Sequence, residues 1–322
     1  MASIVLVEPN KVCRTDVSLS MLPQYLAQPD TLVWLDFNTP TSDEIEILRK
    51  YFQFHPLAIE DAVRQYQRPK IDAYEHYYFV VFYSAKYDDG DKTFKLLPLH
   101  LFIGHNFLVT VHRDAIPALD ETINRWKSPD TPLGRTVGSL VYALLDAIVD
   151  NYFPLIDLFA DQIDMLETTI FEDSKDDSIQ MIFQLKKDLL ALRRVVAPER
   201  DVLNVMMRRE IAVFSSEDII YLQDVYDHVL RVTDSVDTYR DLLSSALDSF
   251  LSLQSNRLNQ IVKVLTVTSI VLMTNSLIAG IYGMNFDFMP ELHWRFGYAW
   301  ALGLMVAATI GLVAFFKRMR WI

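Results

Sequence analysis

The chain has 322 residues, a length that suggests two or so domains and is enough to bury a sizeable core. Its formal net charge of −12 argues against a nucleic-acid partner, because surfaces that bind nucleic acids are basic, and it is compatible with attracting cations. The single cysteine, Cys13, excludes an internal disulfide and fits a reducing compartment.

The first 130 residues are typical of a mixed α/β domain. Runs rich in β-branched and aromatic residues predict strands at residues 4–7, 31–36, 77–83, 97–103 and 107–111. Ser42 is placed to cap a helix that runs to Phe52, and residues 115–126 predict a second helix. Pro129 and Pro132 mark the end of this domain, which we expect to occupy residues 1–130.

From Gly134 onward, apolar residues recur at helical spacing. The pattern predicts helices up to a break at residues 173–177, then from Ile179 to Val195. After a further break at Pro198, another helix runs to about Arg209. We therefore expect residues 131–215 to form a helical region.

The sequence after residue 215 predicts an unusually long helix. No proline occurs from Ser216 to Tyr282, and no glycine occurs before Gly280. Ser216 as the helix cap, followed by Glu217 and Asp218 in the first turn, favours a helix start there. A continuous helix of this length would span roughly 100 Å at about 1.5 Å per residue, far more than a bilayer. We expect residues 216–261 to form a stalk that needs lateral partners, because a helix this long is not stable alone.

Two C-terminal segments are long and apolar enough to cross a membrane. No Asp, Glu, Lys or Arg occurs between Lys263 and Asp287, or from Phe296 to Phe316, and a span needs about 20 apolar residues. Neither is N-terminal, so neither is a signal peptide. Two buried core helices are the less favoured interpretation. We expect transmembrane helices at 262–284 and 297–316, joined by a loop at 285–296 and followed by a basic tail at 317–322.

The charges beside these segments predict their orientation. Basic residues precede the first span and follow the second, whereas the connecting loop carries only Arg295 against two acids. The positive-inside rule then places both termini in the cytoplasm and the loop outside. Aromatic residues occupy the expected interfaces, namely Trp294, Tyr298, Trp300 and Trp321. We expect a multi-pass protein of the plasma (inner) membrane.

One face of the long helix is small and polar at most positions. Steps of three and four residues give Asp248, Ser252, Ser255, Asn259, Val262, Thr266, Ser269, Met273, Ser276, Gly280 and Gly283. Such a stripe either packs tightly against other helices or lines a water-filled path. One helix per chain cannot enclose a path, so the second interpretation requires a symmetric oligomer with rings of identical residues.

In such a pore, the position of each residue along the helix would determine its role. Asp248 would form a carboxylate ring at the cytoplasmic mouth, and Val262 and Met273 would form apolar constrictions. Asn285 follows the stripe and would turn its amide carbonyl to a hydrated cation at the outer entrance. Mg²⁺ fits this arrangement, because it gives up its waters reluctantly and an amide ring can bond to them.

The residues at this point resemble a known family. Residues 278–286 read Ile-Ala-Gly-Ile-Tyr-Gly-Met-Asn-Phe, followed by Met-Pro-Glu-Leu at 289–292 and by Trp294. With two C-terminal spans and a basic tail, this resembles the CorA family of divalent-cation channels. The similarity extends upstream to the Glu-Asp pair at 60–61, Gln-Arg-Pro-Lys at 67–70 and Asp-Val-Tyr-Asp-His at 224–228. It covers nearly the whole chain.

The resemblance implies an α+β fold, with an N-terminal cytosolic α/β domain, a helical bundle with a very long stalk helix and two transmembrane helices, assembled as a funnel-shaped homopentamer. It implies that Mg²⁺ is both transported and regulatory, with Co²⁺ and Ni²⁺ as further ions. The implied selectivity filter is Gly283, Met284 and Asn285. The implied pore residues are Asn259, Val262, Leu265, Met273, Ser276 and Asn285. The implied sensing carboxylates are Asp61 and Asp224, with Glu60, Asp146 and Asp227 as neighbours.

The chain departs from the family at one point. Family members often carry a proline about one turn before the Ile-Ala-Gly run, where this chain has Thr274 followed by Asn275. Without the proline, a backbone hydrogen bond is restored and a kink is removed. Asn275 is off the predicted pore face, so we expect it to bond to a neighbouring helix.

Other classes of protein fit less well. A membrane-anchored enzyme is disfavoured because the sequence has no glycine-rich phosphate loop and no nucleophile motif. The spacing of His100, His105 and His112 matches no recognised metal-ligand pattern, so we expect no enzyme. A purely structural scaffold does not explain the polar stripe. The main alternative is a proton-coupled zinc transporter of the same architecture, in which the residue equivalent to Met284 often varies.

Overall fold

The computed structural model describes residues 2–7, 13–14, 17–64, 67–88, 90, 93–127, 136–173, 177–208, 211, 213–284, 287 and 289–321. The chain divides into two compact units. Unit 1 comprises Met1–Thr169 and Lys175–Ser245, and unit 2 comprises Ile170–Ser174 and Ala246–Ile322.

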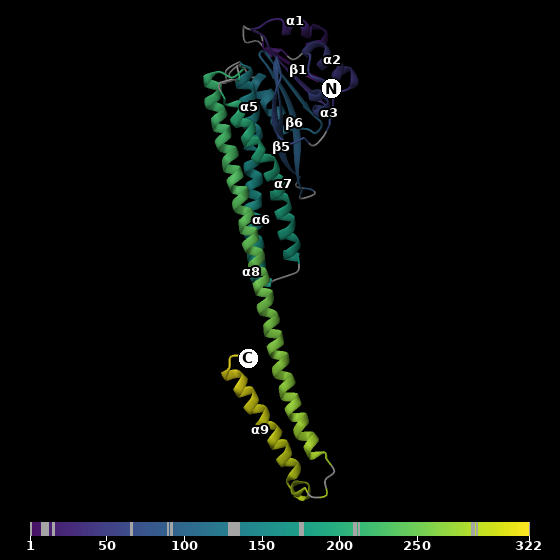
Figure 1. Ribbon diagram of the computed structural model, residues 1–322, viewed down its shortest axis with the longest axis vertical. Coiled ribbons are helices and arrows are strands. Elements are labelled where there is room, and N and C mark those ends of the chain that lie inside the picture. The colour runs from purple at the N-terminus through teal and green to yellow at the C-terminus, as the bar shows by residue number, and fades with distance from the viewer. Residues whose placement is uncertain are drawn as a thin grey trace. The chain divides into compact units, whose positions relative to one another are not determined.

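Unit 1 is built on a seven-stranded mixed sheet with the order β2-β1-β3-β7-β6-β5-β4 (Figure 1). The strands are β1 Ala2–Val7, β2 Cys13–Arg14, β3 Leu32–Asn38, β4 Lys70–Ala73, β5 Tyr77–Asp88, β6 Thr93–Gly104 and β7 Phe107–His112. The pair β3–β7 is parallel and the other pairs are antiparallel. The helices that lie at least partly in unit 1 are η1 Leu19–Met21, α1 Leu22–Leu26, α2 Ser42–Phe52, α3 Pro56–Val63, α4 Pro117–Lys127, α5 Val137–Asp150, α6 Tyr152–Asp173, α7 Asp177–Met206 and α8 Ser216–Tyr282, and α8 continues into unit 2. The expected α+β class is confirmed.

The five predicted strands are all present, and the local sequence also predicts α2, with one correction at its start. The cap is Thr41, not Ser42: its hydroxyl accepts from the backbone N–H of Glu44, whose carboxylate accepts from the N–H of Thr41. The short strands β2 and β4 have no alternating pattern of their own, and they pair with β1 and β5.

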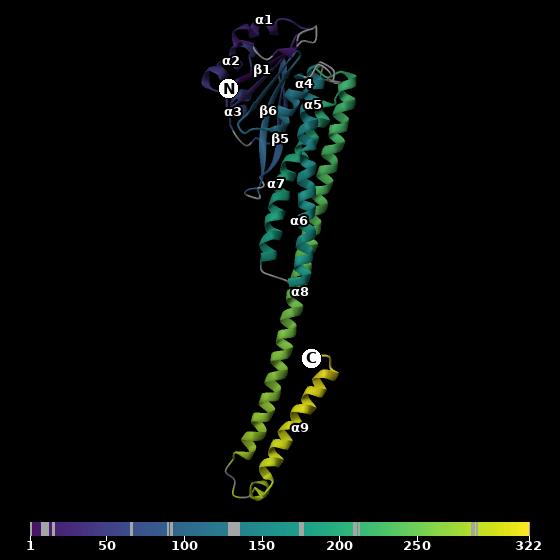
Figure 2. The same ribbon diagram turned by 180° about the vertical axis from the view of Figure 1, so that it is seen from behind.

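The sheet lies between α1–α3 on one side and α4, α5 and α7 on the other (Figures 1 and 2). On the first side, Phe54 anchors the core, with its ring stacked on Phe102 at 4.2 Å and beside Phe52 at 5.1 Å. On the second side, α5 is apolar around most of its circumference and is largely buried. Burial of both faces explains why the central strands read as continuous apolar runs.

Glu199 on α7 completes the hydrogen bonding of β5 beyond the end of β4. β4 pairs with β5 only up to residue 81, so β4 supplies no partner for the backbone of Tyr83. The N–H of Tyr83 instead donates to Glu199 Oε1 at 2.8 Å, and the hydroxyl of Tyr152 lies 2.8 Å from the carbonyl oxygen of Tyr83. Glu199 is fully buried, and burial raises its pKa to about 8.

The helix α7 continues through Pro198, so the expected break there is wrong. A proline removes one backbone donor, and the carbonyl that it would have bonded belongs to Arg194. Arg194 is at an exposed position, where water can take the place of the missing donor. Packing then holds the helix together, because Val196 and Glu199 on either side are buried.

The helix α8 runs from Ser216 to Tyr282 as predicted. The expected cap at Ser216 is wrong, because Ser215 caps the helix. Its hydroxyl accepts from the N–H of Asp218, and Asp218 Oδ2 accepts from the N–H of Ser215 at 2.9 Å. Gly138 on α5 makes room for this turn, since a Cβ there would collide with the Asp218 carboxylate.

Within unit 1, the first part of α8 lies alongside α5, α6 and α7 (Figures 1 and 2). Arg193 on α7 pairs with Asp237 on α8 at 2.6 Å, and Lys186 donates to the Ser244 hydroxyl at 2.9 Å. The stalk expected from the sequence is therefore laterally supported in this unit.

Unit 2 contains the rest of α8, the short helix η2 Pro290–His293 and α9 Gly297–Arg318. The side-chain amide of Asn275 on α8 donates to the Thr309 hydroxyl on α9 at 3.0 Å. This confirms the expected bond from Asn275 to a neighbouring helix. Val267, 5% exposed, lies on the same side of α8.

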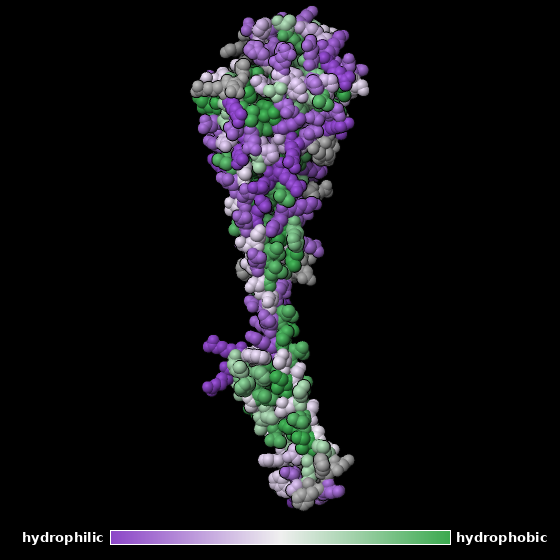
Figure 3. All heavy atoms as spheres, in the orientation of Figure 1, coloured by the Kyte–Doolittle hydropathy of each residue, from purple (hydrophilic) through white to green (hydrophobic). Residues whose placement is uncertain are grey.

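Within the described part of the chain, three helical stretches are long and apolar enough to cross a membrane. The apolar window within residues 137–170 is 67% buried, so α5 and α6 belong to the core of unit 1. The windows in α8 and α9 are only 6% buried, and apolar side chains gather on the surface over α9 and the adjacent part of α8 (Figure 3). These two helices need an apolar environment that the chain does not supply, as two membrane spans require.

Candidate functional site

The predicted ion path lies on α8 in unit 2, on the side away from α9. Val267 and Asn275 mark the side that packs on α9, and the predicted positions are about half a helical turn around from them. The exposed positions are Asp248, Asn259, Val262, Leu265, Ser269, Met273, Ser276 and Gly280. Thr266 is half-buried at the border of this face. The stripe is therefore mostly exposed on the side of α8 away from α9.

The Gly-Met-Asn triplet begins where α8 ends. Met284 is exposed, and its N–H donates to the carbonyl of Ile281 at 3.2 Å. Gly283 lies in the turn that follows α8, and its φ is not positive. A Cβ on Gly283 would lie 3.1 Å from the carbonyl oxygen of Ala279. Asn285 lies outside the described residues.

Asp61 on α3 is held by two donors. Lys70 Nζ lies 2.9 Å from Asp61 Oδ2, and the side-chain amide of Gln67 donates to Oδ1 at 3.1 Å. Lys70 also pairs with Asp72 Oδ2 at 2.7 Å. Burial alone would lower the pKa of Lys70, but the two carboxylates outweigh burial and raise it, so the ammonium is charged at neutral pH. The neighbouring Glu60 pairs with Arg64 at 2.6 Å.

A second cluster joins α5 to α8 in unit 1. Asp146, Asp150 and His228 place one ligand atom each within 4.8 Å of one another. His228 Nδ1 lies 3.6 Å from Asp150 Oδ1, too far for a hydrogen bond, and has no hydrogen-bond partner among the described residues. Burial, followed by the charge of Asp150, raises the pKa of the Asp146 carboxyl. Two carboxylates and an imidazole in this geometry can hold a divalent metal ion.

The other predicted carboxylates lie near this cluster. Asp224 is exposed one turn before His228 on α8, and its charge contributes to the raised pKa of Asp146. Asp227 lines an open hollow on α8 together with Arg231 and Asp234. Among the residues that the structure describes, Asp61 is not part of this group, so one chain does not bring Asp61 and Asp224 into a single site.

Asp150 and His228 were not predicted as ligands from the sequence. The available signal was the repeated spacing of four: 146 and 150 lie on one face of α5, and 224 and 228 lie on one face of α8. That spacing becomes a cluster of three ligands, Asp146, Asp150 and His228, only when α5 and α8 are known to pack together, which no local pattern predicts.

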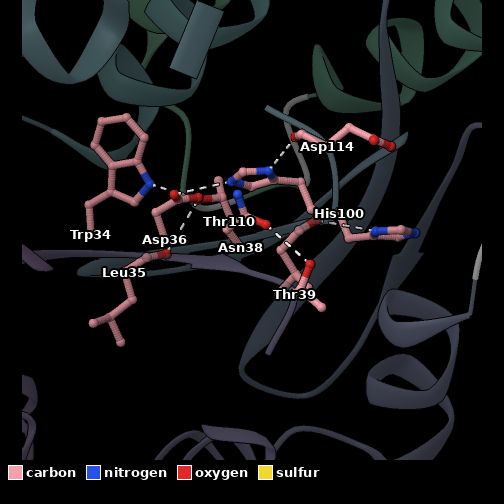
Figure 4. A network of polar contacts seen from close by, with 10 residues as sticks. Trp34, Leu35, Asp36, Asn38, Thr39, His100, Thr110 and Asp114 are labelled. Atoms are coloured by element: carbon pink, nitrogen blue, oxygen red, sulfur yellow. Dashed lines mark hydrogen bonds and ion pairs between the residues drawn. The ribbon is translucent and has the colours of Figure 1, made fainter. Parts of the chain in front are cut away.

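The histidines of the sheet serve its core instead. His112 Nε2 lies 3.2 Å from Asp36 Oδ2 and its Nδ1 lies 2.7 Å from the Asp114 carbonyl oxygen (Figure 4). Burial would lower the pKa of His112, but Asp36 outweighs it and raises the pKa. The partners of the two ring nitrogens are both acceptors, which favours the protonated ring. The hydroxyl of Thr110 donates to Asp36 Oδ1 at 2.5 Å. Burial lowers the pKa of His100 to about 4.

A pair of exposed apolar helices and a cluster of metal-ligand side chains define a class: an integral membrane protein that handles metal ions. Residues 29–318 match the family model described as CorA-like Mg²⁺ transporter protein. The chain is 38% identical over 296 residues to YfjQ of Bacillus subtilis, with 91% of each chain covered. It is 34% identical over 310 residues to the cobalt/magnesium transport protein CorA of Thermotoga maritima, with 96% of this chain and 88% of the relative covered.

The fold agrees with these sequence relations. The solved CorA magnesium transporter of Methanocaldococcus jannaschii matches with a TM-score of 0.85 and 26% identity, covering 100% of this chain and 99% of that chain. The chain belongs to the CorA-like Mg²⁺ transporter family, as the resemblance of its C-terminal motif predicted. It is a transporter of divalent metal ions.

Proposed function

We propose that five copies of this chain form a channel in the plasma (inner) membrane that admits Mg²⁺, and also Co²⁺ and Ni²⁺, down their electrochemical gradients. The exposed stripe of α8 lines the path, both termini lie in the cytoplasm, and unit 1 is the cytosolic domain. Metal ions bound between the cytosolic domains of neighbouring copies hold the channel closed.

The observation that carries the proposal is the exposure of the polar stripe on the side of α8 away from α9. A polar face in a membrane is costly unless it meets water or another protein. Since α9 does not cover the stripe, symmetric copies of α8 can turn it toward a shared axis. Asp248 then attracts cations at one end, and Val262 and Met273 form constrictions that close by dewetting.

The Gly-Met-Asn motif at the end of the stripe supplies the filter. Met284 and Gly283 follow directly from α8, so Asn285 comes within one turn of the stripe along the chain. Its amide is suited to bond with the waters of hydrated Mg²⁺ rather than to strip them. The carboxylate ring at the other end concentrates cations without discriminating among divalent ions.

Two groups of side chains are suited to sensing. Asp61 and Asp224, with Glu60 and Asp227 beside them, are available to meet across copies, and a divalent ion between them would remove their repulsion. Asp146, Asp150 and His228 form the second group. An imidazole among its donors favours Co²⁺, Ni²⁺ or Zn²⁺ over Mg²⁺, which prefers oxygen ligands and waters.

A pair of single-cysteine variants tests the path. In a Cys13→Ser background, Ser276→Cys places the thiol on the stripe, and Ile281→Cys places it on an exposed position about 140° around the helix, toward Leu304 of α9. We expect a charged thiol reagent to block Mg²⁺ uptake into liposomes by the Ser276→Cys protein and to leave the Ile281→Cys protein active. Equal block of both, or of neither, would contradict the proposed path.

The proton-coupled zinc transporter is the alternative outcome of the same assay. The His228 cluster suits zinc as well as cobalt, and Met284 at the middle of the triplet favours magnesium. Zinc uptake that depends on a pH gradient, without Mg²⁺ uptake, would establish this alternative.

A further inference from the structure

Lys70 occupies the space between two carboxylates at the predicted sensor. Its Nζ lies 2.9 Å from Asp61 Oδ2 and 2.7 Å from Asp72 Oδ2, and all three side chains are partly exposed. The second oxygen of Asp61 accepts a hydrogen bond from Gln67. Each oxygen of Asp61 is therefore already engaged by a donor from its own chain.

Local structure produces this arrangement. Lys70 and Asp72 lie on β4 two residues apart, so their side chains share one face of the strand. Asp61 lies in the last turn of α3. The chain then returns to β4, so that Gln67 and Lys70 contact the Asp61 carboxylate. The ring of Phe79 on β5 lies 5.5 Å from Lys70 Nζ and provides a further favourable contact for the cation.

The ammonium of Lys70 weakens the binding of a second cation to the Asp61 carboxylate. It neutralises most of the charge that would attract a divalent ion to Asp61, and it repels an ion that approaches the remaining lone pairs. Asp72 acts in the opposite sense, because it draws the same ammonium away from Asp61. The pair sets how strongly Asp61 is blocked.

We propose that Lys70 is an internal counter-cation that competes with the divalent ion for Asp61, and that the balance between Asp61 and Asp72 sets the ion concentration at which the channel closes. The inference rests on the proposed function, in which Asp61 is a sensing ligand. Lys70 is a positioning residue in this scheme, since it acts on the ion through Asp61.

The test uses two substitutions with opposite expected effects. Full-length protein in detergent is digested over a MgCl₂ titration with a glutamate-specific protease, because none of the substitutions creates or removes a glutamate. We expect Lys70→Met to lower the half-protecting Mg²⁺ concentration, because Asp61 and Asp72 are both released. We expect Asp72→Asn to raise it, because Lys70 is left to Asp61 alone. Because the ion pairs of Lys70 are partly exposed and therefore weak, each shift should be about two- to fivefold.

Opposite shifts exclude a merely structural role, since loss of stability in β4 would move both variants in the same direction. Lys95→Met is the matched control: it removes the same charge from an exposed pair with Asp88 at the far end of the β5–β6 hairpin, and it should leave the titration unchanged. Lys70→Arg keeps the charge and should stay within twofold of the unmodified protein.

Asp61→Asn distinguishes the role of Asp61 as a sensing ligand from the competition by Lys70. If it leaves Mg²⁺ protection unchanged, Asp61 is no sensing ligand, and both the sensor assignment and this inference fail. If it weakens protection while Lys70→Met and Asp72→Asn shift the titration together, or do not shift it, the sensor stands and the competition by Lys70 is wrong.

Discussion

Glu199→Gln should stabilise the protein at neutral pH, although it alters a fully buried group. Tyr152 Oη lies 2.8 Å from the Tyr83 carbonyl oxygen and 3.0 Å from Glu199 Oε2, and its single proton cannot serve both. A protonated Glu199 supplies the second proton and completes both bonds. Glutamine has the same shape, accepts from the N–H of Tyr83 and donates to Tyr152 without any charge to bury.

The magnitude follows from the pKa of Glu199, which burial raises from 4.5 to about 8. A carboxyl with a raised folded-state pKa contributes stability that is fully present below 4.5 and is lost as pH rises through 8. Each pH unit in that window costs about 1.4 kcal/mol, so the loss is about 3 kcal/mol by pH 7. The glutamine variant does not titrate and avoids this loss.

Urea unfolding of the full chain in detergent, from pH 5 to pH 8, measures the effect. We expect the unfolding free energy of the Glu199 protein to fall relative to Glu199→Gln as pH rises, and an infrared carboxylic-acid stretch at pH 7 to disappear in the variant. Glu199→Ala, which leaves the backbone of Tyr83 unpaired, should be destabilised at every pH. A pH-independent difference between the Glu and Gln proteins, or no carboxylic-acid band, would refute a neutral Glu199.

Three further substitutions test other parts of the structure. Asn275→Ala removes the bond to Thr309 and should destabilise the α8–α9 pair by about 1 kcal/mol, seen as an earlier unfolding transition in detergent; an unchanged transition would contradict this role. The His112–Asp36 pair should add stability below pH 6.5 that is lost as pH rises through the raised pKa of His112, and the ring's NMR titration, together with loss of this pH dependence in His112→Gln, checks it. His228→Ala should weaken Co²⁺ binding at least about tenfold in calorimetry and Mg²⁺ binding less; undiminished Co²⁺ affinity would remove His228 from the ligand set.

Local sequence predicted those elements in which local and tertiary preferences agree. The helix α8 was predicted to its last residue, because neither proline nor an early glycine interrupts it. Thr41 and Ser215 show the limit of such reasoning at helix ends, since adjacent Ser and Thr residues offer equivalent caps and only the backbone geometry selects one. Pro198 shows the limit in the interior, where packing on both sides outweighs the loss of one hydrogen bond.

The candidate site divides in the same way. The stripe on α8 follows from helical periodicity, so the sequence alone predicted its exposed side. The cluster of Asp146, Asp150 and His228 depends on how α5 packs against α8, and the pairing of Lys70 with Asp61 depends on how α3 returns to β4. The cluster and the ion pair both depend on tertiary contacts between different elements, and patterns in a single sequence do not predict such contacts.

Mg²⁺ uptake into liposomes that hold the purified protein tests the central claim most directly. We expect uptake down a Mg²⁺ gradient that hexaammine cobalt, a mimic of the hydrated ion, blocks, and that Asn285→Ala greatly reduces. No uptake by the unmodified protein, or undiminished uptake by Asn285→Ala, would contradict a channel for hydrated Mg²⁺ with its filter at the end of α8.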